Sequence, residues 1–508
     1  MSVIGHSCRF PIPFPVVCNV ILRMSSSYSY EDAVHKLNLL QSNKSCLEQI
    51  RKDVLAGKKN TNIEDMKNYL SRIGVTMSML DQLSVIHVAG TKGKGSTSAM
   101  CEAILRRHGL RTGFYLSPHL VAVRERVRLR GAMLSEQQFA HYFQQVYDAL
   151  HATQAYDGDM PKYFAFLTLL AFNVFLKEKV DVAIIEVGIG GIVDYTNVLR
   201  KVPIVGITAL GLDHTSILGS TLPRIATAKA GIMKPGCEAY TVRQPPDAMD
   251  VLRKVAADVQ CPLTVVPDFN TYKFSNGCKI LPIDLDAYRM NASLAIQLAH
   301  AWMRVAKYGK TTNNVVTNGA VSNGAVDECN TVTIIPPETE QALRECRWPG
   351  RYQVIRTENA HFYLDGAHTK ESMEICASWF EENNRDRNKV LIFSATGDRD
   401  VENLLKPLKS IKFKKICFVI PNASVDVNKN QDNYSSVEHE ELLAKCLNNA
   451  NIWRNMNNSD KAEIIVSECV SDALLSIKND SRISVLITGS LHLVGATLSI
   501  INPKLYWK

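Results

Sequence analysis

The residues with the clearest chemical meaning lie in one glycine-rich stretch, VIHVAGTKGKGSTSAM, at positions 85–100. An apolar run leads into Gly90, Gly93 and Gly95, and a helix-forming sequence begins near Ser96. Glycine accepts positive φ and has no Cβ, so backbone N–H groups in such a loop can converge on phosphate oxygens. The helix that follows points its positive end at the same place. The stretch therefore predicts a phosphate-binding loop, with a flexible glycine turn as the alternative.

Side chains of this loop add charge and a possible metal contact. Lys94 supplies a point charge for β- and γ-phosphates, and the hydroxyl of Ser96 or Thr97 can reach a Mg²⁺ ion. The motif differs from that of the common P-loop because Gly95 separates the lysine from the hydroxyl residues. The predicted nucleotide contacts of the loop are Gly90, Thr91, Lys92, Gly93, Lys94, Gly95, Ser96 and Thr97.

Two further polar residues stand where strands are predicted to end. Glu186 interrupts the apolar sequence VAIIEVGIGG, and His214 lies in GLDHTSILG after the next predicted strand. A carboxylate at such a place is either costly or paired with a cation. Because ligands of parallel sheets gather at the carboxyl ends of the strands, we expect both side chains to face Lys94. A helix cap and an ordinary loop histidine are the alternatives.

A row of arginines follows at a period of two. Arg124, Arg126, Arg128 and Arg130 alternate with other residues in VRERVRLRG, positions 123–131. In a strand all four would share one face, which would suit a multiply anionic substrate. A solvated face of an edge strand is the more common explanation of such a pattern.

The elements that must position these residues are predicted to be parallel strands. Apolar runs at 83–90, 180–188 and 202–208 alternate with helical stretches, and each run is too apolar for a sheet with one wet face. Strands buried on both faces are typical of parallel sheets. The sequence thus predicts an α/β fold, with a P-loop domain built on a doubly wound, mostly parallel sheet.

The alternation stops at 309–330, which is rich in Asn, Gly and Thr, and then resumes. We therefore predict a second, smaller C-terminal α/β domain that is Rossmann-like, and we interpret the polar stretch near 422–438 as a surface loop within it. The predicted divisions are 1–27 as a transit peptide or disordered extension, 28–308 as the P-loop domain, 309–335 as a loop or insertion, and 336–508 as the C-terminal domain.

Composition excludes several classes of protein. The net charge of +8 over 508 residues is too modest to indicate a nucleic-acid partner, and no apolar stretch reaches the roughly 18–20 residues that span a membrane. The 13 cysteines include no C-x-x-C pair, so we expect reduced thiols and no zinc ribbon. The first 30 residues contain arginine and serine but no acid, which is typical of a transit peptide, and Met24 offers an internal start.

Taken in order, the motifs resemble those of the folylpolyglutamate synthases of eukaryotic type, within the Mur-like ATP-dependent amide ligases. The resemblance covers about residues 28–502 and includes HVAGTKGKGSTSAM, GFYLSPHLVAVRERVRLRG, MPKYFAFLTLLAF, IIEVGIGGIVDYTNV, LDHTSILGSTLPRIATAKAGIMKPG, NASLAIQLA, RWPGRYQV, LDGAHTKES and ITGSLHLVGA. It implies a P-loop domain like the Mur ligase central domain and a C-terminal glutamate ligase domain. The implied reaction joins L-glutamate to the γ-carboxyl of a tetrahydrofolate (poly)glutamate through an acyl phosphate, with ATP cleaved to ADP and phosphate.

The resemblance also implies roles for individual residues. The implied metal ligands are Ser117, Glu186, His214 and Lys229, the last in carbamylated form. Capture of CO₂ by Lys229 would require a lowered pKa. The implied further nucleotide contacts are Asn291, Arg351 and Asp365, and the implied catalytic residues are Lys94, Lys229, His368 and Asp365. The residues implied to bind substrate are Tyr163, Phe164, Phe166, Asp194 and Ser490, although core packing is the alternative for the aromatic rings.

The same resemblance implies ATP, Mg²⁺ and a monovalent cation such as K⁺ as cofactors. It implies reduced folates and L-glutamate as partners, a monomer, and forms in the mitochondrial matrix and the cytoplasm. Ile192 and Ala228 depart from bacterial relatives and disfavour the bifunctional bacterial enzyme. Three alternatives remain at this stage: a dihydrofolate synthase, a non-catalytic nucleotide-binding homologue and a kinase.

Overall fold

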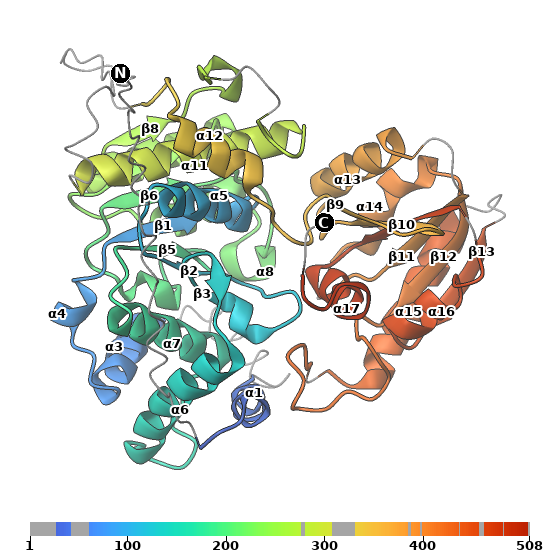
Figure 1. The fold of residues 1–508 in the computed structure, drawn as a ribbon, viewed down its shortest axis with the longest axis horizontal. Helices are drawn as coiled ribbons and strands as arrows, with labels where there is room; N and C mark the ends of the chain where they lie inside the picture. The colour runs from blue at the N-terminus through green and yellow to red at the C-terminus, as the bar shows by residue number, and fades with distance from the viewer. Residues whose placement is uncertain are drawn as a thin grey trace, which may run out of the picture.

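The computed structural model describes residues 27–41, 60–275, 280–306, 331–384, 388–396, 399–435, 437–456, 462–480 and 482–505. It consists of two α/β domains that lie side by side (Figure 1). The first domain contains an eight-stranded sheet and the second a six-stranded sheet. The mostly parallel two-sheet architecture confirms the predicted fold class. Within the described residues, no helix combines the length and apolar character needed to cross a bilayer.

Strands of the first sheet are parallel except at one edge, where β3 and β4 pair antiparallel. In spatial order they are β4 (Ala132–Met133), β3 (Val127–Leu129), β2 (Thr112–Tyr115), β5 (Val182–Glu186), β1 (Val85–Ala89), β6 (Ile204–Ile207), β7 (Glu238–Thr241) and β8 (Leu263–Val265). Side chains alternate between two cores: Val85 and Ala89 face one, and Ile86 and Val88 face the other. This double burial is the physical reason for the continuous apolar runs in the sequence.

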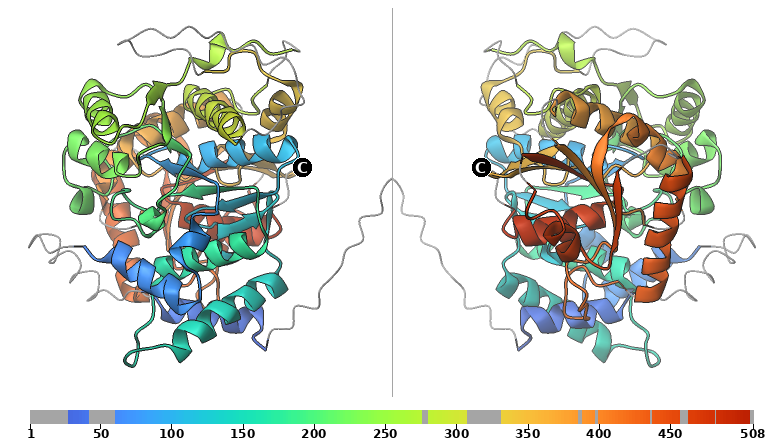
Figure 2. Two further views of the ribbon diagram at one scale, coloured as in Figure 1. Left: turned by 90° about the vertical axis from the view of Figure 1, so that its left-hand side faces the viewer. Right: turned by 90° about the vertical axis from the view of Figure 1, so that its right-hand side faces the viewer.

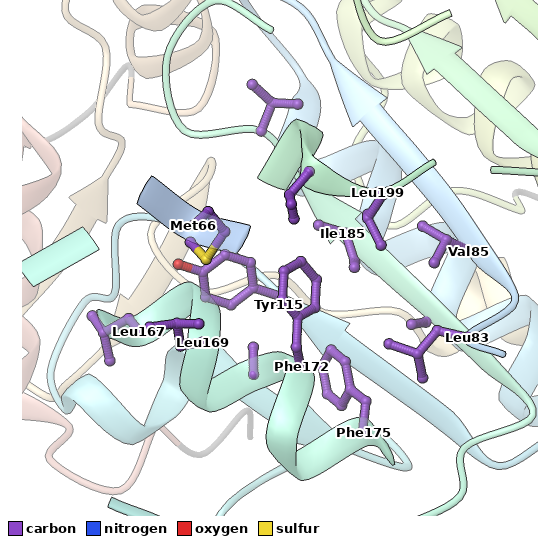
Figure 3. Packing of buried hydrophobic residues seen from close by; sticks show 14 of the residues in the cluster. Met66, Leu83, Val85, Tyr115, Leu167, Leu169, Phe172, Phe175, Ile185 and Leu199 are labelled. Atoms are coloured by element: carbon purple, nitrogen blue, oxygen red, sulfur yellow. The ribbon is translucent and has the colours of Figure 1, made fainter. Parts of the chain in front are cut away.

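Helices cover both faces of this sheet (Figure 2). The helices of the first domain are α1 (Tyr30–Leu39), α3 (Asn62–Arg72), α4 (Met77–Leu80), α5 (Lys94–Arg107), α6 (Glu136–Ala152), α7 (Tyr163–Lys177), α8 (Thr215–Leu218), α9 (Leu222–Ala230), α10 (Pro246–Asp258), α11 (Asp286–Val305) and α12 (Pro337–Glu345). Figure 3 shows α7 packing Phe172 and Phe175 against Tyr115 and Ile185 of the sheet. These side chains are fully buried, so α7 and the sheet form one rigid core.

The second sheet is parallel except for its last strand, β9, which pairs antiparallel with β10. Its order is β13 (Glu463–Ser467), β12 (Phe413–Val419), β11 (Asn388–Phe393), β14 (Ile483–Thr488), β10 (Ala360–Leu364) and β9 (Gln353–Arg356). The helices around it are α13 (Lys370–Glu382), α14 (Val401–Leu405), α15 (His439–Met456), α16 (Val470–Leu475) and α17 (Leu491–Ile501).

Two sequence-based expectations need correction. α12 packs on α5 through the core that contains Ala342 and Leu343, so the chain enters the second domain after α12 rather than at residue 336. The arginines of 123–131 do not share a strand face, because Val123–Arg126 forms a short 3₁₀ helix, η1, and only Arg128 lies on β3. Most of the predicted 309–335 insertion, and residues 1–26, lie outside the described residues.

The domains meet through apolar and polar contacts. Leu120, in the loop after β2, joins the second-domain core that contains Leu493 and Val494. A Cβ added to Gly495 of α17 would lie 2.0 Å from the Leu120 carbonyl oxygen, so helix and loop touch backbone to backbone. The predicted surface loop of the second domain also crosses to the first domain, where the orange chain below α15 approaches α1 (Figure 1). We call residues 428–434 of that loop the docking segment.

Side chains fix the docking segment to the first domain. The Asp432 carboxylate accepts a hydrogen bond from the Val123 backbone N–H at 2.6 Å and another from the Tyr30 hydroxyl. The Asn433 side-chain amide donates to the Leu120 carbonyl oxygen at 2.8 Å. Asn38 of α1 donates to two backbone carbonyls of the segment, at 2.8 and 2.9 Å. The predicted surface loop is therefore an interdomain contact.

Candidate active site

The glycine-rich loop joins β1 to α5 at the carboxyl edge of the first sheet. Gly90 has a φ of 150°, and a Cβ there would lie 1.8 Å from the Thr208 hydroxyl oxygen. Gly93 has a φ of 87° and precedes α5, and a Cβ there would lie 2.1 Å from Oδ1 of Asn291. Only glycine fits either position. The tight loop thus places the N-terminus of α5 directly after the central strand.

Hydrogen bonding divides the loop into two parts. The N–H groups of Thr91 and Lys92 both donate to the Ala209 carbonyl oxygen at 3.0 Å, which anchors the front of the loop to the end of β6. The N–H of Thr97 donates to Gly93 inside the helix. The N–H groups of the first helical turn, at positions 94–96, have no intrahelical acceptor. These groups, rather than those of residues 91 and 92, are the donors that an anion would meet.

Two lysines converge on one carbonyl at this helix end. Nζ of Lys229, from the last turn of α9, donates to the Gly90 carbonyl oxygen at 2.7 Å, and Nζ of Lys94 donates to the same oxygen at 3.2 Å. Burial and the neighbouring Lys94 charge lower the pKa of Lys229 to about 7. No carboxylate forms an ion pair with either lysine in the described parts of the chain. This concentration of positive charge is complementary to an anion.

Ser117 and Glu186 come together beside the loop. Glu186 ends β5, is 4% exposed, and accepts a hydrogen bond from the Ser117 backbone N–H at 3.3 Å. Burial raises the pKa of Glu186, against the opposing effect of Lys94. Both residues line a cavity of about 40 Å³ together with Gly95 and Arg351. The cavity thus joins the sheet edge to a cation from the second domain.

The structure does not bring all the predicted metal ligands into contact, and His214 lies apart from Ser117 and Glu186. His214 adopts a left-handed conformation, with φ of 51°, and precedes α8 as an exposed residue. No described contact joins it to Ser117 or Glu186. Among the residues that the structure describes, no three His, Cys, Asp or Glu side chains are grouped closely enough to hold a metal ion by themselves.

A polar triad links the domains. Nε2 of His368 lies 2.8 Å from Nζ of Lys92 and 3.5 Å from the Asp213 carboxylate, which is itself 3.5 Å from Nζ of Lys92. Nδ1 of His368 donates to the Gly366 carbonyl oxygen at 2.7 Å, so in the neutral ring Nε2 is the acceptor. Burial lowers the pKa of His368 to about 4, which favours that neutral ring, and lowers the pKa of Lys92 to about 8.

Asp213 was not among the predicted site residues. It directly precedes His214 in the same LDH motif, so an acid beside a strand end was the signal that could have identified it.

Arg351 and Asp365 lie together at the start of the second domain. Asp365 follows β10, is 4% exposed, and accepts a hydrogen bond from the Tyr352 N–H at 3.1 Å. Burial raises the pKa of Asp365, and the nearby Arg351 charge opposes that rise. A Cβ at Gly366 would lie 2.6 Å from an Arg351 Nη, so this glycine makes room for the guanidinium. The structure thus brings both predicted nucleotide contacts to the interface.

The predicted substrate residues divide into accessible and structural ones. Tyr163 and Phe164, at the start of α7, are half-buried, and the Arg126 guanidinium lies 5.4 Å from the Tyr163 ring centroid. Phe166 is fully buried and packs 4.9 Å from the Phe143 ring, so the core-packing alternative holds for Phe166.

Asp194 and Ser490 are both buried, and both organise backbone. Asp194 accepts hydrogen bonds from the N–H groups of Gly188 and Ile189, both at 3.1 Å. The Ser490 hydroxyl accepts from the Leu493 N–H at 3.2 Å and caps α17. These bonds are the structural reason for an acid and a serine at the two positions.

Comparisons with known proteins agree with this architecture. A family model described as the C-terminal domain of dihydrofolate synthetase matches residues 350–500. Mitochondrial folylpolyglutamate synthase of Homo sapiens is 37% identical, with 94% of this chain and 93% of the relative covered. A Caenorhabditis elegans protein named as a putative folylpolyglutamate synthase is 38% identical, with 94% of each chain covered.

Solved structures show the same fold. The apo form of the L. casei folylpolyglutamate synthase superposes with a TM-score of 0.68 at 22% identity, and covers 93% of this chain and 100% of its own. A Mycobacterium tuberculosis folylpolyglutamate synthase complexed with ADP and AMPPCP superposes with a TM-score of 0.64 at 24% identity, and covers 87% and 95%.

A glycine-loop domain and a second α/β domain that meet over a cationic centre define a class of two-domain α/β proteins whose fold the solved folylpolyglutamate synthases share. Identity of 35–38% with animal and yeast relatives, over 93–94% of this chain, then identifies the family within the class. The chain belongs to the folylpolyglutamate synthase family, whose members are ligases that add glutamate to folate.

Proposed function

We propose that this chain uses ATP to add L-glutamate to the γ-carboxyl of tetrahydrofolate and its polyglutamates. The observation that carries the proposal is the convergence of Lys94 and Lys229 on the Gly90 carbonyl at the free end of α5. The half-buried Lys94 ammonium and a helix N-terminus are complementary to the phosphates of a nucleotide. Family membership supports the substrate assignment.

ATP would lie between the domains. Its β- and γ-phosphates would contact Lys94 and the N–H groups at positions 94–96, and Arg351 would approach them from the second domain. Asp365 would accept hydrogen bonds from ribose hydroxyls, and Asn291, which lies against Gly93, would contact the base. The Mycobacterium tuberculosis relative complexed with ADP and AMPPCP supports nucleotide binding by this chain.

The donor set at Ser117 and Glu186 fits a magnesium ion. Glu186 is a buried carboxylate with a raised pKa, which a cation would stabilise in its charged form. Mg²⁺ prefers oxygen ligands and commonly uses one or two protein groups with phosphates and water, so a complete protein cage is not needed. When bound, the ion would neutralise charge on the transferred phosphoryl group. His214, and Lys229 as a carbamate, would be the remaining ligands.

The chain's own residues then position two displacements. The γ-carboxylate oxygen of the folate takes the γ-phosphoryl group, and ADP leaves. The glutamate nitrogen attacks the resulting acyl carbon, phosphate leaves, and the nitrogen loses a proton. Lys94 and the end of α5 stabilise charge on the phosphoryl oxygens, and the interface formed by Leu120 and α17 excludes water from the acyl phosphate.

Substrates would occupy the two sides of this centre. Tyr163 and Phe164 offer half-buried rings for a pterin, and Asp194 holds the adjoining loop. His368 and Ser490 lie on the second-domain side, where the incoming glutamate would bind. Lys92 donates to Nε2 of His368 and so orients the ring, and Asp213 lies beside Lys92 at 3.5 Å.

Three finer assignments belong to the proposal. The pKa of about 7 at Lys229 supports a neutral amine that can capture CO₂ as a carbamate. A monovalent cation such as K⁺ would add to the charge around the loop. A mitochondrial form is supported by mitochondrial relatives in human and cattle. A monomeric state and a cytoplasmic form started at Met24 are further parts of the proposal.

The second candidate is a dihydrofolate synthase, which performs the same chemistry on dihydropteroate. The match of residues 350–500 to the dihydrofolate synthetase C-terminal domain favours it. That match covers only the second domain, whereas the folylpolyglutamate synthase relatives cover both. A non-catalytic homologue is disfavoured because Lys94, Glu186, His214 and Asp365 are all retained.

The test uses protein started at Met24, with Mg-ATP, tetrahydrofolate and labelled glutamate. We expect label in a folate product and ADP in equal amounts, with no ADP in the absence of glutamate. The Lys94→Ala variant should lose both products while still folding. Incorporation only with dihydropteroate would favour the second candidate, and glutamate-independent ADP release would contradict the ligase.

A further inference from the structure

A second cavity, larger than the catalytic one, lies on its outer side. It has a volume of about 240 Å³ and lies between α5, the β3–β4 edge, α12 and the linker after α12. Arg128 and Trp348 line both cavities, and the guanidinium of Arg128 stacks 5.1 Å from the Trp348 ring centroid. The pair therefore forms the shared wall. We call this second space the outer cavity.

Cations dominate the lining of the outer cavity. Arg106, Arg107, Arg128 and Arg347 all contribute, against two acids, Glu102 and Glu345. Four positive charges less two negative charges leave a formal charge of +2. Glu102 is 4% exposed and is already bonded to Arg106 and to the Thr112 hydroxyl, at 3.0 and 2.6 Å. Glu345 is largely exposed and lies 3.9 Å from Arg107. The cavity is thus complementary to a ligand with at least two negative charges.

Backbone and ring contacts hold Arg347 and Arg128, and Arg128 also lies 3.9 Å from the Glu125 carboxylate. An Nη of Arg347 donates to the carbonyl oxygens of Arg344 and Cys346 at 2.6 and 3.2 Å. Nε of Arg128 donates to the Glu125 carbonyl oxygen at 3.2 Å. The guanidinium of Arg106 lies against the turn at Gly131, where a Cβ would be 2.6 Å from its Nε. Fixed guanidinium groups with remaining N–H donors suit planar carboxylates.

We propose that the outer cavity binds the carboxylates of a γ-linked polyglutamate tail. Each glutamate that the family's reaction adds contributes one more α-carboxylate. A long product therefore carries more negative charge along its tail than a short substrate does. The side chains of Arg106 and Arg107 are 44% and 42% exposed, which leaves the cavity accessible from solvent. Retention of the tail would favour further additions to the same product. The proposal rests on the family activity and on the catalytic cavity proposed above.

The test measures binding and product length separately. Fluorescein-labelled γ-linked pentaglutamate, which has no pterin, is titrated by anisotropy at low salt in the absence of ATP. The double variant Arg107→Gln, Arg347→Gln should bind the pentaglutamate with a Kd that is about tenfold higher. On the monoglutamate, kcat should stay within about twofold, while products become shorter. Arg253→Gln, at an exposed arginine on α10, is the matched control and should change neither.

Each other outcome has a defined meaning. Pentaglutamate binding that the double variant leaves unchanged would overturn the proposal, as would inorganic phosphate competing as strongly as the pentaglutamate. An unchanged melting temperature of the double variant excludes unfolding as the cause of a loss. Because binding is measured without ATP, a failed anisotropy result would leave the proposed ligase activity intact, and a failed ligase assay would leave the binding result interpretable.

Discussion

The two domains contribute to the active site in different ways. The first domain supplies groups fixed at the edge of a rigid sheet: Lys94 and Lys229 share the Gly90 carbonyl, and Glu186 ends a central strand. The second domain supplies Arg351, Asp365 and His368 from turns around β9 and β10, and they reach the centre only while the domains are in contact.

Both polar and apolar groups make that contact. The polar connections include the Lys92–His368 pair and the docking segment, and the apolar ones include Leu120 and Leu285. The difference suggests that most of the charge stabilisation belongs to the first domain, with Arg351 added from the second, whereas assembly of the complete site depends on closure of the domains. Substitutions in the first domain should therefore abolish chemistry, and those at the contacts should change how well the site assembles.

The largest effect is expected for Lys94→Ala. Loss of this cation should reduce kcat by about two to three orders of magnitude, because preorganised charge at a phosphoryl group cannot be replaced by water. The fold should persist, since Lys94 pairs with no carboxylate in the described chain. ADP release and circular dichroism measure the two properties. A kcat within about tenfold of the parent would break the proposed division between the domains.

An intermediate effect is expected for His368→Ala. We predict a fall of about 10- to 100-fold in kcat/KM for glutamate, because the second-domain side would lose its oriented imidazole. Binding of ADP, measured by calorimetry, should change little because none of the proposed nucleotide contacts, including Arg351 and Asp365 of the second domain, involves His368. Lys92→Gln should produce a smaller loss in the same direction. A large loss of ADP affinity in His368→Ala would show that the domains do not divide the work in this way.

A smaller effect is expected at the docking segment. Asp432→Ala removes the acceptor of the Val123 N–H and of the Tyr30 hydroxyl, and we predict about a three- to tenfold loss of kcat/KM. The exposed Asp426, outside the segment, is the matched control, and Asp426→Ala should behave as the parent. Equal kinetics of the two variants would mean that the segment does not support closure.

The smallest expected effect is a dependence of the free energy of unfolding on pH. Burial lowers the pKa of His87 and His300, both in the first domain, to about 3. Below about pH 6.5 the unfolded chain binds protons that the folded chain excludes, so the free energy of unfolding should fall with pH by up to about 1.4 kcal/mol per pH unit for each histidine. The contribution is fully present above pH 6.5 and is lost progressively toward pH 3.

Hydrogen exchange at pH 7 and pH 5 can locate this loss. Peptides of the first domain should lose protection at the lower pH, and His300→Gln should flatten the dependence. A loss confined to the second domain would contradict the assignment.

Much of the fold could be predicted because its central strands are buried on both faces. The runs around Val85, Ile184 and Ile204 are short and rich in β-branched residues, as expected of strands that are buried on both faces. The glycine loop lies between a strand and a helix, so it was predicted to lie at the edge of the sheet. Edge elements could not be predicted as well. The arginine row has strand periodicity, but its first half forms η1, because the Glu125 carboxylate accepts the N–H groups of Val121 and Ala122.

Polar contacts between residues far apart in the sequence could not be predicted either. The docking segment is polar and has no period, so its sequence reads as solvent-exposed loop, and its partners lie about 300 to 400 positions away. Asp213 was missed for a related reason, since its meaning depends on Lys92 and on His368 from the other domain. For Phe166 the sequence left ligand contact and core packing both open, because an aromatic residue near a site has the same sequence pattern whether it faces the ligand or the core.

Gly495 gives the closed arrangement an evolutionary consequence. Its Cα lies so near the Leu120 carbonyl that a single methyl group would overlap it. Contact between backbone atoms cannot be relieved by rotating a side chain, so a larger residue at 495 requires a different path for the loop that carries Ser117. Positions 495 and 117–122 should therefore change together among relatives, and lineages in which helix α17 acquires a side chain at this point should show a remodelled loop opposite it.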